Sequence, residues 1–155
     1  MKHSSEQTTN RHHLKCLTCD FLTNERLAMD QPNHSPACNL CGAPVDSLEH
    51  VLVVCRATCE VRDRLLPELL NIVVNVQPMC AILQSYTLPS ILTQFILDCT
   101  SLNLPDKYRI PAHTPGISAV FKILRDWTYV VSSERFRLLS KIVRTKQHAE
   151  RLLEN

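Results

Sequence analysis

The sequence CNLCGAPVDSLEHVLVVC, residues 38–55, contains the strongest pattern in the chain. It follows the pattern C-x2-C-x8-H-x4-C, which makes the potential ligands Cys38, Cys41, His50 and Cys55. Two cysteines separated by two residues can hold one ion from a tight turn, and a histidine and a third cysteine on a following helix complete a tetrahedral set. Three thiolates and one imidazole suit Zn²⁺ and leave no open coordination position. The spacing therefore predicts one structural Zn²⁺.

The residues between these ligands fit a zinc knuckle followed by a helix. Gly42 comes directly after Cys41, where the turn of a knuckle commonly needs a positive φ that glycine adopts without strain. Ser47 is placed to cap a helix that carries His50 in its first turn. Cys55 follows His50 by five positions, about 140° round an ideal helix, so the helix must distort or end there. The alternative is a helix on which His50 and Cys55 pack or face solvent without a metal.

The other cysteines leave further possibilities open. In a reducing compartment eight cysteines are better explained as metal ligands or buried thiols than as a disulfide framework. Cys16 and Cys19 form a second C-x2-C pair, but they lie within an apolar helical pattern and are equally suited to a core. Cys59 is an alternative fourth ligand for the main site.

Composition favours an all-α protein. The 155 residues suit one domain, and they include only two glycines against nine prolines, whereas tight hairpins normally need glycine-rich turns. No apolar run approaches the roughly 18 to 20 residues that span a bilayer, and the first residues lack the apolar core of a secretory signal. We therefore expect a nuclear or cytoplasmic protein that is neither secreted nor bound to a membrane.

Patterning predicts a disordered lead-in over residues 1–13 and a single helical domain over residues 14–153. Proline and serine mark the expected helix boundaries within that domain, because proline breaks a helix interior and both residues favour helix starts. The expected helices cover residues 14–29, a segment from 48 to 66, a restart at Pro67 running to 76, starts at Pro78 and Pro89, residues 116–131, and a last helix from Ser132 to 153.

The last expected helix carries a basic stripe. Five of its residues recur at intervals of four, three, four and three, which places them within about 80° of one another on a helix. Such a stripe can neutralise the phosphates of RNA or DNA, but charged outer faces are common on helices, and the alternative is an ordinary solvated face. The overall charge of +2 is too small to imply a polyanionic partner by itself. The candidate nucleic-acid contacts are Arg137, Lys141, Arg144, His148 and Arg151.

No enzyme signature accompanies these features. The sequence has no phosphate-binding loop, no nucleophile elbow, no H-E-x-x-H motif and no adjacent aspartates of the kind that bind the two metals of a polymerase. We therefore expect no catalysis by this chain.

The run over residues 38–55, followed by RATCEVRDRLLPELL, resembles the C-terminal zinc-binding region of non-LTR retrotransposon reverse transcriptases. The four ligand positions match that motif one for one, and the likeness extends roughly over residues 14–140. The resemblance implies an accessory piece that contacts RNA or DNA and works beside the polymerase portion of a parent protein. The polymerase palm and the endonuclease of that family are absent from this sequence. The chain could also be a zinc-stapled protein-interaction module or a non-functional remnant of a decayed element.

Overall fold

The computed structural model describes residues 13–16, 21–73, 89–97 and 115–153, and every regular element in these ranges is helical. The predicted all-α class is therefore confirmed. A helical turn over residues 13–16 comes first. The elements that follow are α2 (Asn24–Asp30), the π-helix η1 (His50–Val54), the 3-10 helix η2 (Arg56–Thr58), α3 (Cys59–Val73), α5 (Pro89–Leu97) and α6 (Ile117–Leu153).

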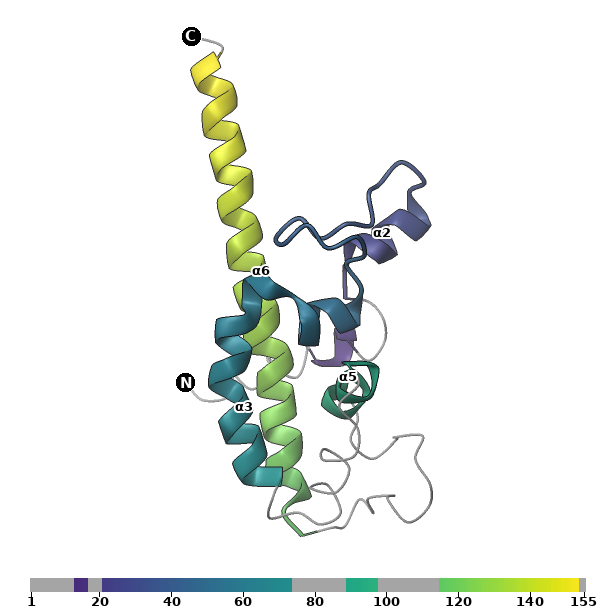
Figure 1. The fold of residues 1–155 in the computed structure, drawn as a ribbon, viewed down its shortest axis with the longest axis vertical. Helices are drawn as coiled ribbons and strands as arrows, with labels where there is room; N and C mark the ends of the chain where they lie inside the picture. Colours follow the sequence, from purple (N-terminus) through teal and green to yellow (C-terminus); the bar gives the residue numbers. More distant parts are fainter. Residues whose placement is uncertain (1–12, 17–20, 74–88, 98–114, 154–155) are drawn as a thin grey trace.

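The long helix α6 organises the fold. Its 37 residues span about 55 Å at 1.5 Å per residue. The first half lies against α3, α5 and η1, whereas the second half extends alone past the rest of the molecule (Figure 1). Among the side chains that the structure describes, the buried apolar residues of α6 lie between Ile117 and Val131, in the half that packs on the body.

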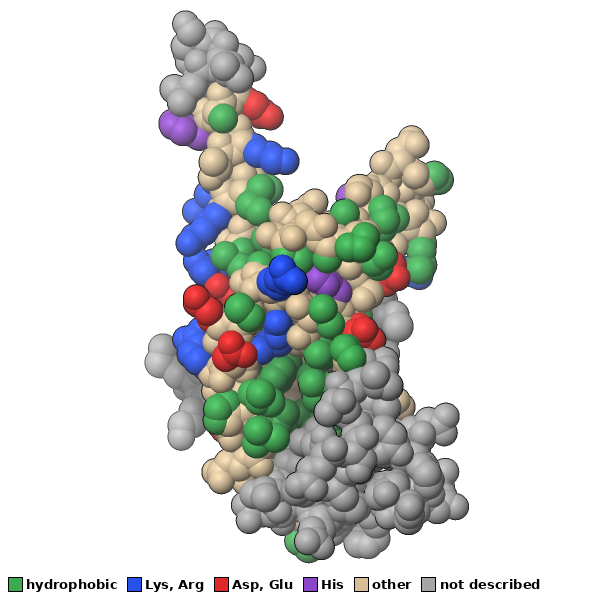
Figure 2. Space-filling view, in the orientation of Figure 1, with side chains coloured by type: hydrophobic (Ala, Val, Ile, Leu, Met, Phe, Trp, Pro, Cys, Tyr) green, Lys and Arg blue, Asp and Glu red, His purple; other side chains and the backbone are tan. Residues whose placement is uncertain are grey.

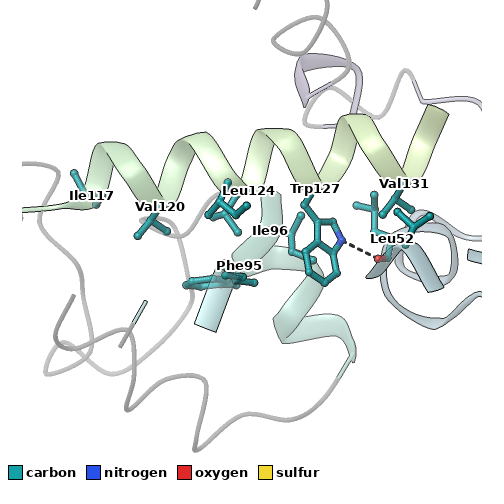
Figure 3. Close-up of a cluster of buried hydrophobic side chains, with 11 residues drawn as sticks. Leu52, Phe95, Ile96, Ile117, Val120, Leu124, Trp127 and Val131 are labelled. Atoms are coloured by element: carbon teal, nitrogen blue, oxygen red, sulfur yellow. Dashed lines mark hydrogen bonds between the residues drawn. The ribbon is translucent and has the colours of Figure 1, made fainter. Parts of the chain in front are cut away.

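The core forms where α3, α5 and η1 meet the first half of α6, and Figure 3 shows part of it. Phe95 and Ile96 of α5 are fully buried against this part of α6. The indole N–H of Trp127, on α6, donates to the carbonyl oxygen of Leu52 at 3.1 Å, which satisfies a buried polar group within η1. This bond joins the first half of α6 to the element that carries His50.

The structure corrects the predicted single helix over residues 14–29. Phe21 and Leu22 are not helical, and Thr23 has an extended backbone with φ −110° and ψ 161°. The Thr23 hydroxyl accepts a hydrogen bond from the backbone N–H of Arg26, so it caps a separate helix, α2. The capping residue outweighs the apolar spacing that suggested one helix.

The predicted restart at Pro67 is also wrong, because α3 runs through this residue without a break. Proline removes one backbone donor, which leaves the carbonyl of Asp63 without its helical partner. Both residues are exposed, so water can reach that carbonyl. Packing of α3 along α6 keeps the two parts of the helix in line.

The predicted boundary at Ser132 is wrong for a similar reason. Ser132 lies inside α6, and its hydroxyl donates to the carbonyl oxygen of Thr128 one turn earlier. A serine that bonds back to its own helix does not act as a cap. The predicted helices over residues 116–131 and from 132 to 153 are therefore one continuous helix.

Some of the predicted segments lie at the limits of the described residues or outside them. The helix predicted to start at Pro89 is present as α5. The helix predicted from residue 116 begins one residue later, because Gly116 has φ +82° and α6 starts at Ile117. The helix expected at Pro78 and most of the lead-in lie outside the described residues, although His13 is described and is buried. None of the helices in the described ranges has the length and apolar character that crossing a bilayer requires.

Candidate metal centre

A tight turn brings the first two cysteines of the motif together. The backbone N–H of Gly42 donates to the carbonyl of Cys38 at 2.9 Å, and the N–H of Cys38 donates to the carbonyl of Ala43 at 2.8 Å. Gly42 has φ +74°, a left-handed conformation that glycine adopts without cost. The predicted role of this glycine is therefore confirmed.

The helix after the knuckle begins at Ser47, its predicted cap, and then becomes a π-helix. The backbone N–H of His50 donates to the Ser47 hydroxyl at 3.0 Å, as the sequence predicts. From His50 to Val54 the backbone forms a π-helix, and the N–H of Cys55 donates to the carbonyl of His50 at 2.7 Å. Bonds across five residues fit one extra residue into the turn. This distortion brings His50 and Cys55 to the same side.

The four predicted ligands form one cluster. One ligand atom from each of them lies within 4.8 Å of the others, close enough to hold a single metal ion. The Cys38 and Cys55 sulfurs are 3.9 Å apart, and the Cys41 sulfur is 3.3 Å from Nε2 of His50. In a tetrahedral site with Zn–S bonds of about 2.3 Å, sulfurs lie about 3.8 Å apart. The cluster therefore has the dimensions of a zinc site, and Nε2 is the His50 nitrogen that faces the Cys41 sulfur.

The surroundings set the protonation of these ligands. Burial lowers the pKa of His50, and the charges of Arg135 and Arg62 add to this effect against the opposing charge of Asp46. A lowered pKa keeps the imidazole neutral, which is the form that binds metal. Burial raises the pKa of the Cys55 thiol to about 11. A bound cation would reverse that preference, because a coordinating thiol is deprotonated.

Cys41 is the most exposed of the four ligands. Burial raises the pKa of its thiol, but hydrogen bonds from the backbone of Ala43 and the side chains of Cys38 and Cys55 outweigh this, and the net pKa is lowered. A lowered pKa makes the thiolate of Cys41 easier to form than that of an ordinary cysteine, and the thiolate is the form that binds a metal ion.

A buried ion pair beside the cluster is the feature that sequence reasoning missed. Arg135 of α6 and Asp46 of the knuckle are 5% and 0% exposed, and the guanidinium bonds both carboxylate oxygens, Nη1 to Oδ1 at 3.0 Å. Nη1 also lies 4.0 Å from the Cys38 sulfur. The two residues are 89 positions apart in the sequence. Their burial, which appears only in the folded structure, sets them apart from the other charged residues. Neither residue belongs to a local motif that would have indicated the pair.

The remaining cysteine hypotheses are resolved in part. Cys59 is exposed and stands outside the cluster, so it is not a ligand in this arrangement. Cys16 is buried, and burial raises the pKa of its thiol to about 12, as for a core residue. Its proposed companion, Cys19, lies outside the described residues.

The predicted basic stripe lies on the part of α6 that extends past the body, and its five residues are exposed. Figure 2 shows lysine and arginine side chains along one edge of this segment. Arg137 makes two hydrogen bonds to the Glu134 carboxylate, so its charge is partly neutralised. Lys141 and Arg144 make no ion pair among the residues that the structure describes.

Comparison with known proteins finds no matching family model, no matching curated protein and no matching solved structure.

Proposed function

We propose that the chain is a zinc-stapled nucleic-acid-binding domain. The zinc is structural, because the four side chains fill a tetrahedral set and leave no position for water. It joins the knuckle to η1, which packs against α6, and contributes its binding free energy to folding. The distances among the four ligand atoms carry this part of the proposal.

The nucleic-acid interface is the projecting half of α6. A single helix that stands clear of the body can approach the sugar-phosphate backbone of RNA or DNA along its length. Lys141, Arg144, His148 and Arg151 lie on one side of it, and each cation that meets a phosphate displaces counterions. The exposure of this stripe on an extended helix is the observation that supports the interface. The resemblance to the retrotransposon region fits the same role and is part of the proposal.

Fluorescence anisotropy with labelled RNA and duplex DNA over a salt series tests the interface. The double variant Lys141→Glu/Arg144→Glu should bind far more weakly than wild type, and its dependence on salt should be shallower because fewer counterions are displaced. Lys146→Glu is the matched control for the single variant Lys141→Glu, because Lys146 lies on the same segment but about 140° round the helix from Lys141. Absence of binding at low salt, or equal losses in Lys141→Glu and Lys146→Glu, contradicts the interface.

A second candidate is a zinc-stapled protein-interaction module. Phe136 and Leu22 are 74% and 65% exposed, and they line a hollow of about 390 Å³ together with Phe21 and Leu139. Exposed apolar side chains beside a hollow are typical of protein-binding surfaces. In this case Phe136→Ser would abolish partner binding, whereas charge reversal at Lys141 and Arg144 would leave it intact.

A further inference from the structure

The ion pair between Asp46 and Arg135 lies where three parts of the chain meet. Asp46 belongs to the knuckle, between the second and third ligands, and Arg135 comes from α6. Oδ2 of Asp46 also accepts a hydrogen bond from the backbone N–H of Asn24, at the start of α2, at 3.0 Å. The backbone N–H of Asp46 donates to the carbonyl of Pro36 at 2.8 Å. One buried carboxylate therefore holds the knuckle, α2 and α6 together.

The guanidinium is also placed to act on the ligands. Its Nη1 atom lies 4.0 Å from the Cys38 sulfur, and the carboxylate of Asp46 fixes it there through two parallel hydrogen bonds. Cys38 is itself buried, so water gives little screening between the two groups. Three thiolates and Zn²⁺ together carry a charge of −1, since −3 and +2 sum to −1. Arg135, paired with Asp46, places the positive end of this ion pair beside the Cys38 sulfur of that anionic cluster.

We propose that Arg135 is a positioning residue of the metal centre, whose charge stabilises the Cys38 thiolate in the loaded site while Asp46 holds the guanidinium in place. The inference rests on the metal site of the proposed function. Groups that orient and stabilise metal ligands typically change metal affinity by about 10- to 100-fold when they are removed. Arg135 would therefore be a determinant of zinc affinity that lies 97 positions from the ligand it serves.

A purely structural ion pair would behave differently. A buried pair can often be replaced by a neutral pair of similar volume without loss of stability, whereas removal of one partner leaves an uncompensated charge. The double variant Asp46→Asn/Arg135→Gln removes both charges and keeps hydrogen-bonding groups at both positions. If the pair only joins elements, this variant should fold and bind zinc as wild type does.

The test measures zinc affinity of the full chain by competition with a chromogenic chelator, and the thiolate-to-metal charge-transfer absorption of the Co²⁺-loaded protein. We expect the neutral double variant to keep its helical circular dichroism, to bind zinc at least about tenfold more weakly, and to shift the charge-transfer band. The control is Glu134→Gln/Arg137→Gln, which removes an exposed ion pair from the same part of α6 and should change neither readout. Wild-type affinity and an unshifted band in Asp46→Asn/Arg135→Gln would overturn the inference.

Arg135→Lys separates charge from geometry and covers the case in which the neutral variant does not fold. Lysine keeps the positive charge but loses the planar fork that bonds both oxygens of Asp46. We expect a folded Arg135→Lys protein to bind zinc more tightly than folded Arg135→Gln, and equal affinities in the two would overturn the role of the charge. Failure of wild type to bind zinc would instead reject the proposed metal site itself.

Discussion

The backbone N–H of Cys55 donates to the carbonyl of His50 at 2.7 Å, and this single bond across five residues explains the spacing of the last two ligands. On an ideal α-helix the two side chains would point about 140° apart. The π-helical turn removes that separation, and η2 begins directly after Cys55. Single π-helical turns inside helices occur frequently at functional sites. The irregular backbone here has a geometric purpose, which is to bring the third and fourth ligands together.

The conformation of Gly42 gives the first prediction. Gly42→Ala should destabilise the protein by about 1–2 kcal/mol, because an L-residue with a side chain is strained at φ +74°. No heavy atom lies within 4 Å of the position that a Cβ would occupy, so the cost comes from the backbone and not from a clash. Gly42→Asn should cost less, since asparagine tolerates this region. Unfolding in guanidinium chloride measures the stability of both variants. A Gly42→Ala protein as stable as wild type contradicts the left-handed conformation of Gly42.

The second prediction concerns the hydrogen bond from the Trp127 indole to the Leu52 carbonyl. Trp127→Phe keeps most of the aromatic bulk in the core but leaves the Leu52 carbonyl buried without a donor. We expect a loss of about 1–3 kcal/mol in the free energy of unfolding, measured by circular dichroism because the only tryptophan is removed. An unchanged midpoint would mean that this bond contributes little to the attachment of η1 to α6.

The third prediction concerns Pro67, whose replacement should raise the stability of the protein. Proline inside a helix is about 3 kcal/mol less favourable than alanine, partly offset by the lower entropy of an unfolded chain that contains proline. Pro67→Ala in the exposed middle of α3 should therefore stabilise the protein by about 2 kcal/mol. Thermal unfolding of the two proteins tests this, and a lower melting temperature for the alanine variant contradicts a continuous α3.

Local and distant interactions differ in how well the sequence predicts them. The ligand set, Gly42 and the Ser47 cap were predictable because all of them lie in one continuous stretch of 18 residues, 38–55. The continuous passage of α3 through Pro67 and of α6 through Ser132 was not, because packing between distant segments overrides a local signal for a helix end. No local sequence pattern predicts that Arg135 is buried and paired with Asp46. A charged residue on a helix is normally at the surface, and only the fold places this one against the knuckle.

The buried thiol of Cys16 gives a prediction for pH. Its pKa is raised from 9.0 to about 12 in the folded protein, so between these values the unfolded state binds fewer protons than the folded state. Stability must therefore fall as pH rises above about 9, by up to about 1.4 kcal/mol for each unit. Denaturant unfolding at about pH 8.5 and about pH 10 should show this loss in wild type and a smaller one in Cys16→Ala. Identical losses in the two proteins contradict burial of this thiol.

The decisive measurement for the metal centre is the zinc content of the purified protein, determined by atomic emission beside Cys38→Ala, His50→Ala and Cys59→Ala. The cluster geometry predicts one zinc per chain in wild type and in Cys59→Ala, whose thiol lies outside the cluster. It predicts a marked loss of zinc from Cys38→Ala and His50→Ala, because each removes one of four ligands. Wild-type protein without zinc, or undiminished zinc in both ligand variants, would contradict a zinc site built from these four side chains.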